Sequence, residues 1–129
     1  MAYSGTVAIT RPSSRLTVVT VTETEGGASS EVELVTAGGD RPPRAGRLLR
    51  CIATRSAGTA TTRQPRLGIA AAATTGQIRY QATTTAVGTT IDEQPTASVT
   101  YEGPALYHRS QPDAGSDNAM ITVYHFGPA

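Results

Sequence analysis

Short runs rich in β-branched residues recur along the whole chain, and turn residues such as Gly, Pro, Asn and Asp separate them. In the clearest run, residues 77–82, Ile78, Tyr80 and Ala82 alternate with polar side chains, as in a half-buried strand. We interpret nine runs as strands: residues 3–10, 15–22, 31–36, 46–54, 59–64, 77–82, 98–101, 105–108 and 118–126. Only residues 67–75 could be helical, and they are too few and uncapped to be stable alone. The spacing therefore predicts an all-β fold, one antiparallel β-sandwich or jelly-roll-like domain over residues 1–129, with roughly 8–10 short strands.

Three of these runs carry expectations about individual side chains. In residues 15–22 the apolar side chains change face between Val18 and Val19, which predicts a β-bulge at that point. Residues 46–54 are typical of a buried strand, with Leu49, Cys51 and Ala53 on the inner face. The last run is apolar on both faces, so we expect a central or covered strand there.

The material for a hydrophobic core is thin. Leu, Ile, Val and Phe together number 22 of 129 residues, whereas Ala and Thr number 19 and 21. The formal net charge of only +1 argues against disorder, which needs high charge as well as low hydrophobicity. We therefore expect a thin sandwich that gains stability from neighbouring subunits or from a host surface.

Charge and cysteine content exclude several classes of partner and site. All 11 basic residues are Arg, and the near-zero net charge argues against nucleic acid or a membrane as the main partner. No basic and apolar leader and no apolar run of about 20 residues occurs, so we expect neither a secretion signal nor a membrane span. The single Cys51 excludes an internal disulfide and a multi-cysteine metal site.

Residues that could carry catalysis or bind a metal are few. Neither His108 nor His125 has another ligand at a standard metal spacing, and we interpret His125 and Cys51 as packed structural side chains. Asp113 and Asp117 could supply oxygen ligands to calcium, but Tyr124 stands where an EF-hand needs its bidentate Glu. We interpret that segment as a turn, and expect no catalytic residue, no metal site, no cofactor and no enzymatic activity.

The most distinctive local feature is the segment RPPRAGR, residues 41–47. Arg41, Arg44 and Arg47 recur every third residue, so in a polyproline-like stretch they share one side. Such a row would suit an acidic partner surface, because guanidinium groups bind carboxylates in a bidentate manner. The alternative is a solvated loop with scattered charges.

Two stretches of the chain suggest a family. Residues 104–126, PALYHRSQPDAGSDNAMITVYHF, resemble the last hairpin of small β-sandwich proteins from tailed-bacteriophage particles. The Ala- and Thr-rich body and residues 46–68, GRLLRCIATRSAGTATTRQPRLG, fit the same class. The closest functional match is the head decoration (cement) proteins on the outside of the icosahedral shell. The resemblance covers most of the chain in composition and rhythm, and it contains no diagnostic motif.

This resemblance implies a structural virion protein that decorates and stabilises a bacteriophage capsid by binding across shell-subunit junctions. Its partners would be the major capsid protein and copies of itself in a dimer or trimer. Its location would be the virion, assembled in the host cytoplasm. Exposed loops and the N-terminal segment with Tyr3 would make the contacts. Decoration suits a compact β domain with many weak contacts, since its strength comes from multivalency on a repeating surface.

Three alternatives remain open. A phage tail, baseplate or neck component would have the same composition. A carbohydrate- or receptor-binding β module would use Tyr3, Tyr101 and Tyr107 as exposed platforms. An enzyme comes last, because the one pair of carboxylates, Asp92 and Glu93, is adjacent and would face opposite sides of a strand.

Overall fold

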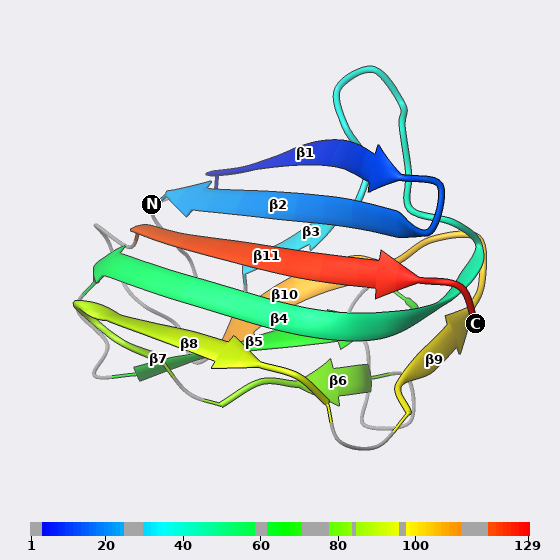
Figure 1. The fold of residues 1–129 in the computed structure, drawn as a ribbon. Helices are drawn as coiled ribbons and strands as arrows, with labels where there is room; N and C mark the ends of the chain where they lie inside the picture. Colours follow the sequence, from blue (N-terminus) through cyan, green and yellow to red (C-terminus); the bar gives the residue numbers. More distant parts are fainter. Residues whose placement is uncertain are drawn as a thin grey trace.

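The computed structural model describes residues 4–24, 30–58, 62–70, 78–83, 85–95, 98–111 and 119–129. All regular secondary structure in these described residues is β-strand. Figure 1 shows the strands as two facing antiparallel sheets. The strands are β1 Ser4–Ser13, β2 Leu16–Thr24, β3 Ser30–Glu33, β4 Ala45–Ala57, β5 Thr62–Gly68, β6 Ile78–Gln81, β7 Thr85–Ala86, β8 Thr89–Glu93, β9 Thr100–Glu102, β10 Tyr107–Gln111 and β11 Ala119–Gly127. The predicted all-β sandwich is confirmed. The described residues form no helix that is long and apolar enough to cross a membrane.

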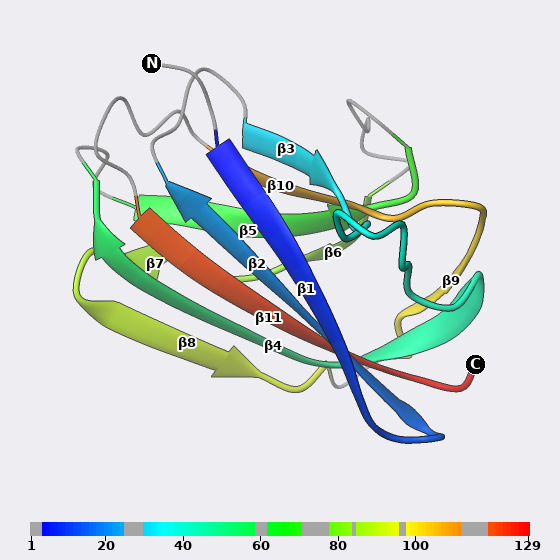
Figure 2. The same cartoon turned by 90° about the horizontal axis from the view of Figure 1, so that it is seen from above.

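The order of the strands is that of a jelly roll. The six-stranded sheet runs β1-β2-β11-β4-β8 with β9 also on β4, and the five-stranded sheet runs β3-β10-β5-β6 with β7 also on β5. The antiparallel pairs are nested along the chain: β2 with β11, β3 with β10, β4 with β8, and β5 with β6. A ribbon of nested pairs that alternates between two sheets is the winding of a jelly roll. Figure 2 shows the two layers from above.

The hydrophobic core lies between the inner faces of the two sheets. The six-stranded sheet contributes side chains at alternate positions, because successive strand residues point to opposite faces. The largest of the buried apolar side chains are Tyr124, Phe126, Leu34, Leu67 and Met120. Val7 and Ile9 of the edge strand β1 are partly buried against this cluster, which ties the N-terminal strand to the sandwich.

The predicted bulge at Val18 and Val19 is wrong. β2 pairs with β11 without a register shift, and its inward positions Val19, Val21 and Glu23 are all fully buried. Val18 points to the outer face of the sheet. The outer face also carries apolar side chains here. Val18 on the outer face and Val19 on the inner face therefore gave the same sequence pattern as a bulge.

A bulge occurs instead in β4. His125 of β11 pairs with Arg50 while Phe126 pairs with Leu48, so Leu49 is the extra residue. The prediction that Leu49 points inward is therefore wrong, since Leu48 is buried and Leu49 only partly so. Cys51 and Ala53 are fully buried as expected.

Several other expectations about strands are confirmed. β11 is central, between β2 and β4. In β6 Tyr80 packs against the core and Ala82 just after the strand is buried, whereas Arg79 and Gln81 are exposed. The inward direction expected of Ile78 is wrong, because a register shift after Leu67 places Ile78 opposite Gly68 on the outer face. β1 continues through Pro12, beyond the predicted end of the run. Proline has no N–H group to donate, but an edge strand tolerates it because one side of the strand has no neighbour to bond. Of the segment that could have been helical, residues 67–68 end β5 and residues 71–75 lie outside the described residues.

Candidate functional site

A cluster of polar side chains is enclosed between the two sheets. Glu23 on β2, His108 and Ser110 on β10, and Tyr124 on β11 all point inward at alternating strand positions. His108 Nδ1 lies 2.6 Å from Tyr124 Oη, and His108 Nε2 lies 3.3 Å from Glu23 Oε1. Ser110 Oγ donates a hydrogen bond of 2.8 Å to Glu23 Oε2. The cluster therefore joins the six-stranded sheet to the five-stranded sheet.

The chemistry of this cluster is limited by its burial. A carboxylate, an imidazole and a phenol in contact could exchange protons, but each of these side chains is fully buried and therefore closed to a substrate. Buried polar groups of this kind must be hydrogen-bonded, and here their partners are one another. We interpret the cluster as an internal brace. Glu23 and His108 are 85 residues apart, so no local sequence pattern could have revealed it.

The interior is polar at one end of the sandwich, where β2, β4 and β10 end. Arg55 near the end of β4 is fully buried, and its Nη1 donates to the carbonyl oxygen of Thr85 at 3.3 Å. Thr122 is also fully buried there, between Met120 and Tyr124 along β11. The thin apolar core predicted from the composition is thus confined largely to the other end.

The thiol of Cys51 is unsuited to nucleophilic chemistry. Burial, followed by the nearby charges of Glu93 and Asp92, raises the pKa of Cys51 to about 12. At neutral pH the group is therefore a protonated thiol, and only the thiolate is reactive. Within the described part of the chain, no three His, Cys, Asp or Glu side chains lie close enough together to hold a metal ion. Asp113 and Asp117, the two residues of the calcium hypothesis, lie outside that part.

His125 lies on the outer face of the six-stranded sheet, beside an ion pair. Arg50 Nε donates to Asp92 Oδ1 at 2.8 Å, and Arg50 Nη2 also contacts Asp92 Oδ2. The hydrogen bond from Arg50 lowers the pKa of Asp92. Partial burial and the positive charge of Arg50 together lower the pKa of His125, against the opposing charge of Asp92. Asp92 and its neighbour Glu93 face opposite sides of β8, as predicted, so they do not form a catalytic pair.

The structure places the predicted arginine row in two different elements. Arg41 and Arg44 lie in the loop before β4, whereas Arg47 belongs to β4 itself. Arg41 Nη2 forms an ion pair with Glu33 Oε2 at 2.9 Å, so this guanidinium is already engaged. Arg44 and Arg47 are exposed. The shared side expected of a polyproline helix therefore does not extend to Arg47.

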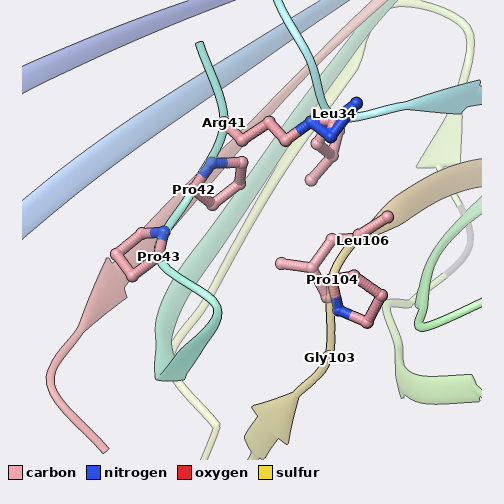
Figure 3. Close-up of a pocket in the computed structure, with 8 residues that line it drawn as sticks. Leu34, Arg41, Pro42, Pro43, Gly103, Pro104 and Leu106 are labelled. Atoms are coloured by element: carbon pink, nitrogen blue, oxygen red, sulfur yellow. The ribbon is translucent and has the colours of Figure 1, made fainter.

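The loop that carries Arg41 packs over the apolar end of the sandwich. Figure 3 shows Pro42 turned toward Leu106 and Pro104 across a shallow hollow. Pro42 is buried, and the loop is also tied to β1 by Arg11, which donates to both carboxylate oxygens of Asp40 at 2.7 and 2.9 Å. The prolines thus hold the loop against the core.

A surface hollow beside Phe126 and Pro128 is too small for a typical small-molecule ligand. Its volume is about 100 Å³, whereas small-molecule sites have about 300–1,000 Å³. Of the tyrosines that could form a carbohydrate platform, Tyr101 is only 4% exposed, Tyr107 is partly buried and Tyr3 lies outside the described residues. Tyr101 therefore cannot act as an exposed platform.

The outer face of the six-stranded sheet is broad and carries few charges. Where β1, β2, β11, β4 and β8 lie side by side, its charged side chains are Arg50 and Asp92, which neutralise each other, and the exposed Arg47 where β4 pairs with the end of β11. The other outward side chains are Thr6, Ala8, Thr10, Val18, Thr20, Thr22, Ile52, Thr54, Thr90, Ile121, Val123 and His125. Figure 1 views this face, and no described element covers it. Ile121, on the central strand β11, is 45% exposed.

The outer face of the five-stranded sheet has a different character. Arg66 on β5 and Arg109 on β10 lie directly opposite each other there, beside a hollow that Gly68, Ile78 and Tyr107 also line. Reasoning from the sequence did not find this pair, because it depends on the register of two strands that are far apart in the chain.

Comparisons with protein-family models, with curated proteins and with solved structures find no match.

Proposed function

We propose that the chain is a structural protein that binds a protein lattice through the outer face of its six-stranded sheet. The observation that carries this proposal is the breadth and low charge of that face, with Ile121 exposed on its central strand. A face of Thr, Val and Ile packs well against another flat protein surface and poorly against nucleic acid or a charged membrane. The lattice that we propose is the capsid of a tailed bacteriophage, which the chain decorates and stabilises.

The size of the face supports an assembly role. Five strands spaced by about 4.8 Å, with about eight residues of about 3.3 Å each, present roughly 600 Å². A stable pairwise interface buries about 800 Å² on each partner. One such contact is therefore weak, and it becomes strong only when many copies, or a dimer or trimer, bind a repeating surface.

The jelly-roll winding is compatible with this role without being specific to it. Viral coat proteins, lectin domains and cupins share the architecture, so the fold alone does not assign a function. A tail, baseplate or neck component would use the same kind of face, and the difference between these assemblies is one of copy number.

Quantitative mass spectrometry of purified phage particles tests the proposal. We expect this chain at a copy number close to that of the major shell protein. A handful of copies per particle would move the chain to the tail, baseplate or neck. Absence from particles would overturn the proposal that this is a virion protein. The outer face would then be expected to bind a protein surface other than a capsid.

A further inference from the structure

Two arginines face each other across neighbouring strands of the five-stranded sheet. Arg109 of β10 and Arg66 of β5 are register partners, so their side chains lie on one face with Cβ atoms about 4.5–5.5 Å apart. Their chain neighbours His108, Ser110 and Leu67 are fully buried, so that face is the outer one. Like charges directly opposite each other destabilise a sheet. The pair therefore costs stability unless something neutralises it.

Neither guanidinium is neutralised within the described part of the chain. Arg66 donates from Nε and Nη2 to the neutral Gln64 Oε1, both at 3.2 Å. Arg109 Nε is buried and has no acceptor. Glu31 lies opposite Arg109 on β3 and is itself engaged in an interaction. Two guanidinium groups thus lie side by side on one small area of surface.

The surface beside this pair is apolar and slightly hollowed. Gly68, Ala70, Ile78 and Tyr107 line the hollow together with Glu31 and the two arginines. Gly68, which carries no side chain, lies in register with the partly buried Tyr107. A ligand here would meet guanidinium groups on one side and aliphatic and aromatic atoms on the other.

We propose that this arginine hollow, formed by Arg66, Arg109, Gly68, Ile78 and Tyr107, binds one carboxylate of an acidic, otherwise apolar segment of a partner protein. The carboxylate bridges the accessible parts of the two guanidinium groups, since guanidinium and carboxylate groups match in hydrogen-bonding geometry. A neighbouring aliphatic side chain of the segment packs on Ile78 and Tyr107. Two cations on a chain of net charge +1 suit a single carboxylate better than a run of phosphates.

This proposal does not depend on the proposed function, because it concerns the opposite face of the sandwich. Both hold together if the chain bridges two partners, one on each sheet. Either can fail alone: absence from phage particles leaves the arginine hollow untouched, and an empty hollow leaves the outer face of the six-stranded sheet untouched.

A titration followed by nuclear magnetic resonance tests the hollow with defined probes. The whole chain, labelled with nitrogen-15, receives acetyl-Leu-Asp-Leu-amide, with acetyl-Leu-Asn-Leu-amide as the matched neutral probe. We expect the Nε–Hε signals of Arg66 and Arg109 to shift and saturate at millimolar concentrations of the Asp peptide only. The variants Arg66→Gln and Arg109→Gln should each weaken that binding at least tenfold, whereas Arg44→Gln, at an exposed loop position, should not change it.

Three results of the titration would overturn the proposal. The first is an equal response to the Asn peptide, and the second is unchanged binding in both Arg→Gln variants. The third is tighter saturation by inorganic phosphate than by the Asp peptide, which would assign the hollow to phosphate. Thermal unfolding at low salt provides a readout independent of ligand. Because repulsion is relieved, Arg109→Gln should melt at a temperature equal to or above that of the parent chain, and a clear fall would also contradict the proposal.

Discussion

Two buried tyrosines differ in what their hydroxyl groups contact. Tyr124 Oη lies 2.6 Å from His108 Nδ1, whereas Tyr101 Oη is buried without a hydrogen-bond partner. Tyr124→Phe leaves a ring nitrogen of His108 buried and unpaired, which we expect to lower the free energy of unfolding by about 1–3 kcal/mol. Tyr101→Phe is the matched control and should change it by less than about 0.5 kcal/mol. Urea unfolding of both variants checks this, and equal losses would contradict the bracing role of the cluster.

Glu93 gives the stability of the chain a dependence on pH. Its carboxylate accepts hydrogen bonds from Tyr80 Oη at 2.5 Å and from Thr83 N at 3.1 Å. Partial burial opposes ionisation, but the donors of Thr83 and Tyr80 outweigh it, so the pKa of Glu93 lies below its ordinary value of 4.5. Because the folded pKa is the lower one, the stabilisation is complete above pH 4.5 and is lost as the pH falls through the lowered pKa.

The variant Glu93→Gln isolates this contribution. We expect it to melt at a lower temperature than the parent chain at pH 7, and its melting temperature to fall less steeply between about pH 5 and pH 3. Glu102→Gln, at an exposed position on β9, should leave the slope unchanged. An unchanged slope in Glu93→Gln would show that this carboxylate does not link the sheets.

At the scale of the elements, β4 needs a glycine where three strands meet. A Cβ atom on Gly46 would lie 2.7 Å from Tyr101 Oη and 2.9 Å from the carbonyl oxygen of Gly127, on β9 and β11. Backbone cannot move aside cheaply, so Gly46→Ala should destabilise the chain by about 1–3 kcal/mol. Gly38→Ala, where the nearest atom is 3.9 Å away, is the control. Thermal unfolding compares the two, and equal stability would contradict this packing.

The elements also show where periodicity succeeds and fails. It predicted the strand β6 with Tyr80 inward and the central position of β11, but not the register shift that turns Ile78 outward. It failed at Val18, because an outer face that is also apolar removes the contrast on which periodicity depends. It failed at Leu49, because Leu49 is the extra residue of a bulge and the inward alternation passes to Leu48 on one side of it. The sequence contains no local signal for this bulge.

At the scale of the whole molecule, the sites depend on pairings that close only when the jelly roll winds. Glu23 meets His108 where the two sheets pack face to face, and Arg66 lies beside Arg109 through the register of strands distant in sequence. The row Arg41, Arg44 and Arg47 was visible in the sequence because its spacing is local. Its surroundings were not visible, since the ion pair of Arg41 with Glu33 depends on how the loop packs. Local patterns thus predict strands and turns, and tertiary pairing decides which charges remain available.

A prediction for the whole molecule tests whether the outer face of the six-stranded sheet is the capsid-binding surface. Ile121 and Val87 are equally exposed, at 45% and 44%, but Ile121 lies on the central strand of the outer face of the six-stranded sheet and Val87 lies in the turn between β7 and β8. Neither change to Asp removes a buried contact of the monomer, so Ile121→Asp and Val87→Asp should melt within a few degrees of each other. Burying an unpaired carboxylate in an interface is costly, so Ile121→Asp should cosediment with purified capsids at least tenfold more weakly than the parent chain. Val87→Asp should bind as the parent does, and equal binding by both variants would place the contact on another surface.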